Sequence, residues 1–435
     1  MYHGQIKIFA KYNSPRLKYI AGLLVGNILG SDWKIVTDKR DIGDDPVINY
    51  SSETISGSLR INPYELLYEE GIKHVELYVR EWKGLPAFFM TDRNADIPFD
   101  IFSASFYLVT RYEEYLDFQP DMHGRFQASS SISYRHGFLG IPVVDLWVKE
   151  LASELTLKYP GLDYRNDGYK ALLTIDSDQP FAYLGKNLAR SIGGLLNDVV
   201  SRTGNAWERV RVLTKRAKDP FEIYDYITSC LEATNTDARF FFPAGRYTKF
   251  DKNPSWNNDL YRGLIERISR KYKTGLHPSY YASDNYTLLK SEKGRLSSIL
   301  CREVTSSRFH FLRLKIPVSY KNLSEAGILE DYTMGFPEEP GFRAGIARPF
   351  MFYDLSEEKQ TGLRIIPLHV MDATLYQYRK LDARAAEEVI MNLIAETRKA
   401  GGLFVSLWHN TSLIENADCE DWRKLFEKML KIQQP

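Results

Sequence analysis

The amino-acid sequence predicts an α/β protein with two parts: a smaller mixed α/β domain over residues 1–165 and a (β/α) barrel over residues 166–435. From Lys170 onward, strand-like apolar runs alternate with helix-like segments, which is typical of parallel strands joined by helical crossovers. Segment 161–170, GLDYRNDGYK, is polar and rich in turn residues, so it marks the boundary. The 435 residues, 44% of them hydrophobic, suffice for at least two hydrophobic cores.

Local patterns predict the elements of the first domain. Apolar residues recur at helical spacing over 17–28 and stop before Gly30, which predicts a helix. β-rich segments bounded by turn residues predict strands, and two long apolar segments, one after Pro98 and one before Pro160, predict helices. These four segments are 33–38, 47–52, 99–118 and 143–159.

The second domain shows the alternation that predicts a barrel of eight strands or fewer. Its first helix has Asp219 as N-cap and Pro220 at the first helical position. Working residues of such barrels lie at the carboxyl ends of the strands. The expected strands are 170–176, 238–244, 274–278, 309–316, 363–372 and 403–410, and the expected helices are 220–235, 258–275, 285–304, 319–328 and 383–402.

A basic helical insertion near 185–220 interrupts this alternation. Its apolar stripe predicts either a helix that packs on the protein or an amphipathic helix at a membrane surface, and the first is favoured. The stripe consists of Leu188, Ile192, Leu195 and Val199.

Charge, cysteine usage and the first residues limit the class of protein. The formal net charge of +1 offers no electrostatic basis for binding nucleic acid. Cys230, Cys301 and Cys419 form no CxxC pair, and their odd number is typical of free thiols in a reducing compartment. The apolar stretch 20–29 is too short to span a bilayer and precedes no cleavage site, so we expect a cytoplasmic protein without a transmembrane segment.

The stretch ALLTIDSDQP, residues 171–180, ends an apolar strand with Asp176 and Asp178. Residues two apart in a strand share a face, so both carboxylates can point into the mouth of the barrel. Two carboxylates held close together are unfavourable unless a cation or a shared proton relieves their repulsion. A single Asp at a strand end, however, commonly serves as a turn or helix-cap residue.

Histidines occur at or near the ends of other predicted strands. His277 and His409 follow apolar runs, and His369 with Asp372 ends a third. His310 lies among apolar neighbours, and both His310 and His369 could instead be core residues. Asp and His together form the ligand set of a zinc-type site, beside which a second carboxylate can act as general base.

At these residues the chain resembles the polysaccharide deacetylase superfamily (NodB homology, carbohydrate esterase family 4), over about residues 165–430. The matching segments are LTIDSD, ARFFFPAGRY, GLHPSYYAS and LFVSLWHN. The resemblance implies an incomplete, seven-stranded barrel. It also implies Asp176 as catalytic base, Asp178 and His277 as metal ligands, and His409 as general acid.

The chain departs from the family pattern at two places. The second motif of the family has another histidine four residues after the first, and this sequence has Tyr281 there. His310, from the neighbouring predicted strand, could supply the third ligand. The arginine motif is also unclear, and Arg343 in EPGFRAG is the candidate that would orient the base.

The chain is also similar to bacterial proteins that place an uncharacterised N-terminal domain before a divergent deacetylase-like domain. The segments RYEEY, HGRF, GFRAG and WHN carry this similarity. It assigns no activity to the first domain.

Taken together, these observations predict a hydrolase that uses a divalent metal, zinc being preferred, to deacetylate an N-acetylated sugar or polysaccharide. Tyr280, Tyr281 and Trp408 are the candidates for stacking on a sugar ring, although aromatic residues also serve simply as packing. Tyr281 in place of histidine favours an alternative, a non-catalytic carbohydrate-binding or scaffold protein on a degenerate deacetylase fold. An enzyme of different chemistry on the same barrel is a third hypothesis.

Overall fold

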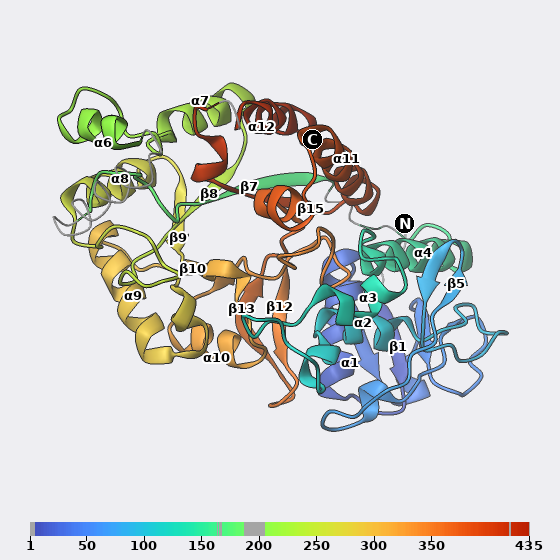
Figure 1. Ribbon diagram of the computed structural model, residues 1–435. Helices are drawn as coiled ribbons and strands as arrows, with labels where there is room; N and C mark the ends of the chain where they lie inside the picture. Colours follow the sequence, from blue (N-terminus) through green and yellow to red (C-terminus); the bar gives the residue numbers. More distant parts are fainter. Residues whose placement is uncertain (1–4, 163, 165–167, 187–204, 417–418, 435) are drawn as a thin grey trace.

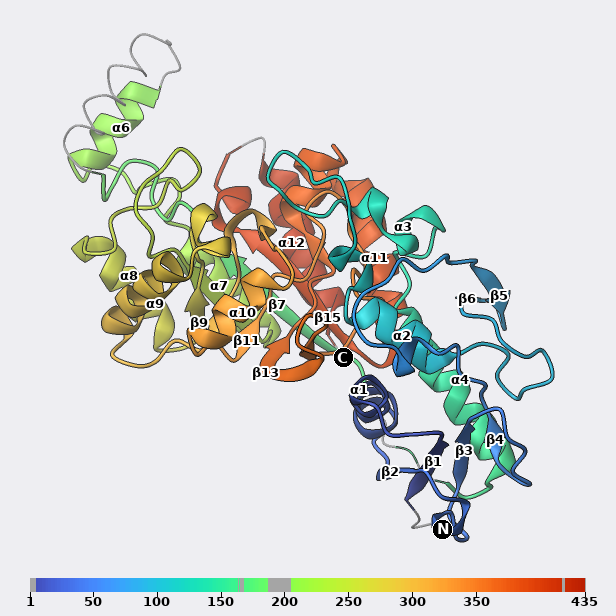
Figure 2. The same cartoon turned by 90° about the horizontal axis from the view of Figure 1, so that it is seen from below.

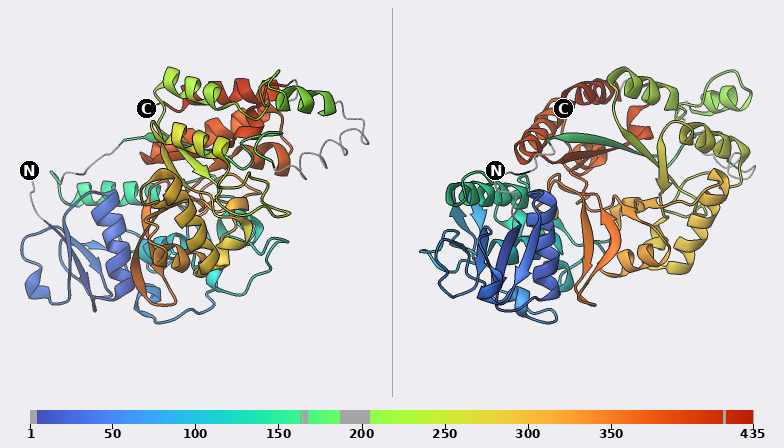
Figure 3. Two further views of the ribbon diagram at one scale, coloured as in Figure 1. Left: turned by 90° about the vertical axis from the view of Figure 1, so that its left-hand side faces the viewer. Right: turned by 180° about the vertical axis from the view of Figure 1, so that it is seen from behind.

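The computed structural model describes residues 5–162, 164, 168–186, 205–416 and 419–434 (Figure 1). Two sheets organise these residues, one of four strands near the N-terminus and one of nine strands in the rest of the chain. Helix α1, Pro15–Ala21, lies between the smaller sheet and strands β12, Phe350–Asp354, and β13, Lys359–Ile365, of the larger one (Figures 1 and 3). The protein is therefore a mixed α/β structure in which most strand pairs are parallel.

The first sheet has the strand order β2-β1-β3-β4, and all its pairs are parallel. Helix α1, Pro15–Ala21, begins where Ser14 accepts a hydrogen bond from the amide of Leu17, and it continues as a π-helical segment to Ile28. The helix expected over 17–28 is thus present. The strands are β1 Ile6–Ala10, β2 Trp33–Val36, β3 Val47–Tyr50 and β4 Leu59–Arg60, and a separate hairpin joins β5 Arg80–Trp82 to β6 Leu85–Ala87.

The single helix expected over 99–118 is divided in the structure. Helix α2, Ile101–Val109, is followed by Arg111 in a left-handed conformation (φ 56°) and then by a short 3-10 helix, Tyr112–Tyr115. The second expected helix is present as α4, Val143–Lys158, after the short α3, Ile132–Arg135.

The nine-stranded sheet has the order β12-β13-β11-β10-β9-β8-β7-β15-β14. Helices α7 to α12 lie on the outside of this curved sheet (Figure 1). Its end strands, β12 and β14, do not pair with each other among the described residues, so closure into a barrel stays a prediction. The strands are β7 Lys170–Asp176, β8 Ala238–Phe242, β9 Lys273–Leu276, β10 Ser306–Ser307, β11 Glu330–Asp331, β12 Phe350–Asp354, β13 Lys359–Ile365, β14 Val370–Met371 and β15 Leu403–His409.

Helices connect most of these strands, as the alternation in the sequence predicts. Strand β7 lies between β8 and β15 in parallel register, which brings Asp176 opposite His409. The helices are α7 Tyr224–Thr234, α8 Asp259–Ser269, α9 Tyr286–Leu300, α10 Val318–Glu325, α11 Ala383–Ala400 and α12 Glu420–Ile432.

Two predicted strands differ in the structure. Segment 309–316 is not a strand, because Phe311 and Leu312 adopt left-handed conformations (φ 62° and 47°) and place His310 on a short 3-10 turn. Segment 363–372 contains the end of β13 and the separate strand β14. The antiparallel pairing of β12 with β13 had no counterpart among the expected elements.

The basic insertion is described only in part, and its apolar stripe at Leu188, Ile192, Leu195 and Val199 lies outside the described residues. Helix α6, Asn205–Leu213, extends from one end of the molecule (Figure 2). It contacts the rest of the protein through Glu208, which accepts a hydrogen bond from the hydroxyl of Tyr183 at 2.7 Å. Within the described part of the chain, no helix is both long and apolar enough to cross a membrane.

A buried ionic cluster joins the N-terminal region to the segment between β11 and β12 of the larger sheet. Glu114 accepts from Arg343 at 3.0 and 2.6 Å and from Arg111 at 2.7 Å, and both guanidinium groups are 1% exposed. Burial raises the pKa of Glu114, but the two arginines outweigh burial and lower it below its usual range. Glu114 is therefore ionised, and it is the acidic partner of Arg343 and, together with Glu113, of Arg111.

We expect Glu114→Gln to lower the free energy of unfolding by about 3–5 kcal/mol, because Arg343 would stay buried without a carboxylate partner and Arg111 would keep only Glu113. Urea denaturation followed by circular dichroism measures this loss. Glu420→Gln is the control, since Glu420 pairs with Lys424 and each side chain is 66% exposed. It should cost less than about 1 kcal/mol, and equal losses in the two variants would contradict the prediction.

Candidate functional site

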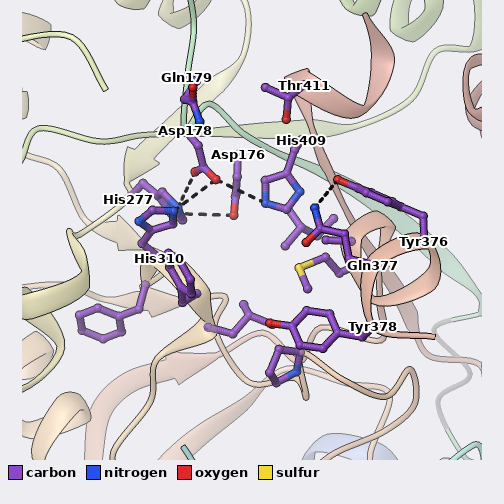
Figure 4. Close-up of a pocket in the computed structure, with 17 residues that line it drawn as sticks. Asp176, Asp178, Gln179, His277, His310, Tyr376, Gln377, Tyr378, His409 and Thr411 are labelled. Carbon is purple, nitrogen blue, oxygen red and sulfur yellow. Dashed lines mark hydrogen bonds and ion pairs between the residues drawn. The ribbon is translucent and has the colours of Figure 1, made fainter. Parts of the chain in front are cut away.

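A pocket of about 220 Å³ lies at the carboxyl ends of β7, β9 and β15 (Figure 4). Asp176 ends β7, Asp178 follows two residues later, His277 comes directly after β9, and His409 ends β15. His310 reaches the same pocket from the turn after β10. Parallel strands end at the same edge of a sheet, which explains why residues so distant in sequence meet here.

Asp178, His277 and His310 form the candidate metal site. Their potential ligand atoms all lie within 4.8 Å of one another. The Nε2 atom of His277 is 2.9 Å from Asp178 Oδ1, and the Nε2 atom of His310 is 3.3 Å from Asp178 Oδ2 (Figure 4). His277 Nε2 and Asp178 Oδ1 are buried, yet neither makes a hydrogen bond of good geometry. Unsatisfied buried donor atoms that converge in this way fit a bound cation.

The other ring nitrogen of each histidine is held by the protein. His277 Nδ1 donates to the carbonyl oxygen of Arg308 at 2.7 Å, and His310 Nδ1 donates to Asp251 at 2.9 Å. These bonds orient both rings so that Nε2 faces Asp178. Metal-ligating histidines are typically held by such outer hydrogen bonds.

The Asp178 carboxylate in this cluster is stabilised by positive charge close to it. Burial raises the pKa of Asp178, but His310 and His277 outweigh burial and hold it well below its usual range. Burial lowers the pKa of His310, but Asp178 and Asp251 raise it to about 9. Without a metal, the buried carboxylate is thus stabilised by protonated imidazole, and a divalent cation can take over that role.

Asp176 lies beside the metal cluster and is 2% exposed. Its Oδ2 is 3.8 Å from His277 Nδ1, and its Oδ1 is 3.5 Å from Arg308 Nη1. Arg308 is fully buried and is fixed by hydrogen bonds to Thr174 Oγ1 at 2.7 Å and to the carbonyl of Tyr332 at 3.1 Å. Arg308 is therefore the arginine that can orient Asp176.

The sequence predicts Arg343 at that orienting position, but the structure places Arg343 elsewhere. Its guanidinium is buried against Glu114 and donates to the carbonyl of Gly335 at 2.9 Å. Arg308 immediately precedes the pair Phe309–His310, and the sequence offered no spacing rule to distinguish it from other arginines. The parallel pairing of β10 with β9 places Arg308 so that its Nη1 lies 3.5 Å from Asp176 Oδ1.

His409 is paired with Asp372, which follows β14. The Nδ1 atom of His409 donates to Asp372 Oδ1 at 2.7 Å, and the amide of His409 donates to Asp372 Oδ2 at 2.7 Å. Burial lowers the pKa of His409, but Asp372, with Asp178 and Asp176, raises it to about 10. His409 can therefore hold a proton on Nε2, which lies 3.7 Å from Asp178 Oδ2.

The three predicted sugar-stacking residues do not line this pocket. Trp408 is 1% exposed and packs against Phe426 in the core, because alternate residues of β15 face opposite sides and Leu407 and His409 face the pocket. Tyr280 stacks on Phe250 and Tyr281 is 45% exposed. The period of two along β15 was a signal that could have excluded Trp408.

Other aromatic and polar side chains line the pocket, and the sequence did not predict them as site residues. Tyr376 and Tyr378 belong to the π-helical segment Thr374–Tyr378, which also contributes Gln377. Figure 4 shows these side chains opposite Asp178 and His310. No periodicity in the sequence marks such a turn, so no pattern could have identified them.

Comparison with known proteins adds a family match to part of the chain. Residues 6–160 match the model of a family of unknown function, DUF7033. No curated protein matches the chain.

Among solved structures, the chain is similar to the polysaccharide deacetylase Bc1974 from Bacillus cereus, with 12% identity over 61% of this chain and 85% of that chain, and a TM-score of 0.28. PuuE allantoinase shows 11% identity over 62% of this chain and 85% of that chain, with a TM-score of 0.39. BA3943, a CE4-family pseudoenzyme from Bacillus anthracis, shows 12% identity over 61% of this chain and 63% of that chain, with a TM-score of 0.29.

The metal site leads to a prediction about its third ligand. Wild-type protein purified without chelator or metal-affinity chromatography should contain about one zinc ion per chain. His310→Ala should lose most of it, because two ligands from the protein hold zinc weakly. Tyr281→Ala should keep it, since Tyr281 lies outside the cluster. Elemental analysis measures the metal content, and an equal loss from both variants would contradict the assignment.

Proposed function

We propose that this pocket is the active site of a metal-dependent hydrolase that removes the acetyl group from an N-acetylated sugar. One observation carries the proposal: a possible Asp–His–His metal site lies beside a buried carboxylate, Asp176, and a histidine held by a second carboxylate, His409 with Asp372. A metal site flanked by a potential base and a potential acid fits amide hydrolysis.

Zinc is the ion that these donors fit best. One carboxylate and two neutral imidazole nitrogens are a common protein ligand set of catalytic zinc, with further positions left to water and substrate. A divalent ion bound there would lower the pKa of water and polarise the carbonyl oxygen of the substrate.

Asp176 is the proposed general base. Its carboxylate lies next to the metal cluster but outside the set that converges on Asp178, so it is free to accept a proton. The guanidinium of Arg308 lies 3.5 Å from Asp176 Oδ1 and can fix the direction of the carboxylate. As water attacks the acyl carbon, Asp176 would take one of its protons.

His409 is the proposed general acid. Its proton on Nε2 would pass to the amide nitrogen as the carbon–nitrogen bond breaks, so that the amino sugar leaves as a neutral amine and the acyl group leaves as acetate. Asp372 holds the ring and stabilises its protonated form. Water supplies the oxygen that acetate gains, and His409 supplies the proton that the amine gains. The enzyme regains its starting state when Asp176 releases the proton it took from water and His409 takes up a proton.

The proposed substrate class rests on the pocket mouth. Tyr376 and Tyr378 can present ring faces to a sugar, and Gln179, Gln377 and Thr411 offer groups that bond hydroxyls. An N-acetylated carbohydrate is therefore the proposed substrate.

We also propose that residues 166–435 form a seven-stranded barrel of the deacetylase type, and that the domain boundary lies between residues 165 and 166.

Asp176→Asn should lower acetate release by about a hundredfold to ten-thousandfold, because the amide cannot accept the proton. Its zinc content should stay at the wild-type level, since Asp176 is outside the ligand set. The assay uses a panel of N-acetylated amino-sugar oligomers with acetate as the readout.

Asp259→Asn is the matched control, because Asp259 is an exposed acid at the start of α8 and should leave turnover unchanged. Full activity in Asp176→Asn would remove Asp176 as the base. A zinc-loaded wild type that releases no acetate from any substrate in the panel would favour the non-catalytic carbohydrate-binding or scaffold protein.

A further inference from the structure

A turn of the N-terminal region, residues 121–125, contacts the loop that carries His310. The turn lies within residues 6–160, the part that matches a family of unknown function. The loop it contacts, residues 310–313, follows β10 of the larger sheet. This contact connects the N-terminal region directly to the candidate metal site.

The His310 loop has an unfavourable backbone. Phe311 and Leu312 both adopt left-handed conformations, with φ of 62° and 47°, although neither is glycine. Such conformations persist only where surrounding contacts hold them. The position of the His310 imidazole therefore depends on the contacts that hold Phe311 and Leu312, the two residues after it.

Two reciprocal hydrogen bonds between the N-terminal region and the His310 loop hold this backbone in place. Arg125 Nη1 donates to the carbonyl of Phe311 at 2.6 Å, and Arg313 Nε donates to the carbonyl of His123 at 3.0 Å. Arg125 of the turn thus binds a carbonyl of the loop, and Arg313 of the loop binds a carbonyl of the turn. Phe311, the residue with the left-handed backbone, is itself one of the anchored groups.

Arg125 is fixed before it reaches the loop. Its side chain is 4% exposed, and its Nε donates to Asp121 Oδ2 at 2.7 Å. The amide of Arg125 donates to the other carboxylate oxygen at 2.9 Å, and a turn at Gly124 (φ 75°) closes the segment. A side chain held at both its base and its guanidinium is a rigid support.

A second route leads from the same turn to the outer partner of His310. His123 Nδ1 lies 3.1 Å from the hydroxyl of Tyr280, and the amide of Tyr280 donates to Asp251 Oδ1 at 2.9 Å. The same oxygen of Asp251 accepts from His310 Nδ1 at 2.9 Å. The 121–125 turn thus supports both the backbone of His310 and its ring.

From these contacts we infer that the N-terminal region completes the metal site, with Arg125 as the positioning residue that holds His310 through the carbonyl of Phe311. The inference rests on the proposed function, because it takes His310 as a metal ligand. It gives the 121–125 turn a role in metal binding, although no residue of the turn is a ligand.

The test measures zinc affinity of the full-length protein by competition with a chromophoric chelator. Arg125→Met should raise the dissociation constant for Zn²⁺ about 10–100-fold, the range typical of lost outer-shell support. Arg125→Lys should recover part of the affinity, because its ammonium can still donate to the Phe311 carbonyl. Arg313→Met, at a side chain that is 19% exposed, removes the reciprocal bond together with the bonds of Arg313 to Tyr280, Ser283 and Asp284, and it too should weaken zinc binding.

Arg16→Met is the matched control. Arg16 is also a buried arginine of the N-terminal region, and it also bonds across to the larger sheet, through Glu358, far from the pocket. It should lower the thermal midpoint but change the zinc dissociation constant less than about twofold.

Wild-type zinc affinity in Arg125→Met and Arg313→Met would overturn the inference and leave the proposed function standing. Equal weakening in Arg16→Met would also overturn it, because the effect would then be general loosening. A wild-type protein that binds no zinc would overturn both.

Discussion

The two carboxylates at the end of β7 are the constraint on which the site depends. Asp176 is buried and Asp178 is half-buried at the same strand end, and carboxylates shielded from water need positive charge nearby. Arg308 faces the first, while His277 and His310 face the second. The basic groups therefore have an electrostatic reason to converge here, whatever the reaction, and a divalent cation would satisfy the same need more completely.

The N-terminal region is tied to this site through buried charge rather than apolar packing alone. Arg111 and Glu114 meet Arg343 in one buried cluster, and Arg125 reaches the carbonyl of Phe311 in another contact. Ionic groups of this kind are costly to bury and are sensitive to geometry, so they hold two parts of a chain in one arrangement. This explains how a segment that contributes no residue to the metal cluster can still affect it.

The segments RYEEY, HGRF and GFRAG, which carried the similarity to other bacterial proteins, supply the residues of these contacts. Arg111 and Glu114 come from the first segment, Arg125 from the second and Arg343 from the third. Their charged side chains are visible in the sequence. Their burial is not, because it results from pairing between segments that lie 186 and 229 residues apart.

Local patterns were enough to predict the alternation of strands and helices from Lys170 onward, and the carboxylates at the end of β7. Apolar runs and caps are properties of neighbouring residues, so β7, β8, β9 and β15 lie where the pattern indicates them. The same patterns were wrong for segment 309–316, where an alternation typical of a strand occurs in a turn with left-handed residues.

The sequence by itself determined that Asp176, Asp178, His277 and His409 lie at or just beyond the ends of strands, because strand ends follow from local composition. Only the tertiary structure decided that Arg308, not Arg343, faces Asp176, that Asp372 holds His409, and that Trp408 points into the core. It also decided that the turn with His310 comes within reach of Asp178. The physical reason is that sheet register and contacts between distant segments determine which groups pair with buried charges. Neither can be read from the spacing of neighbouring residues.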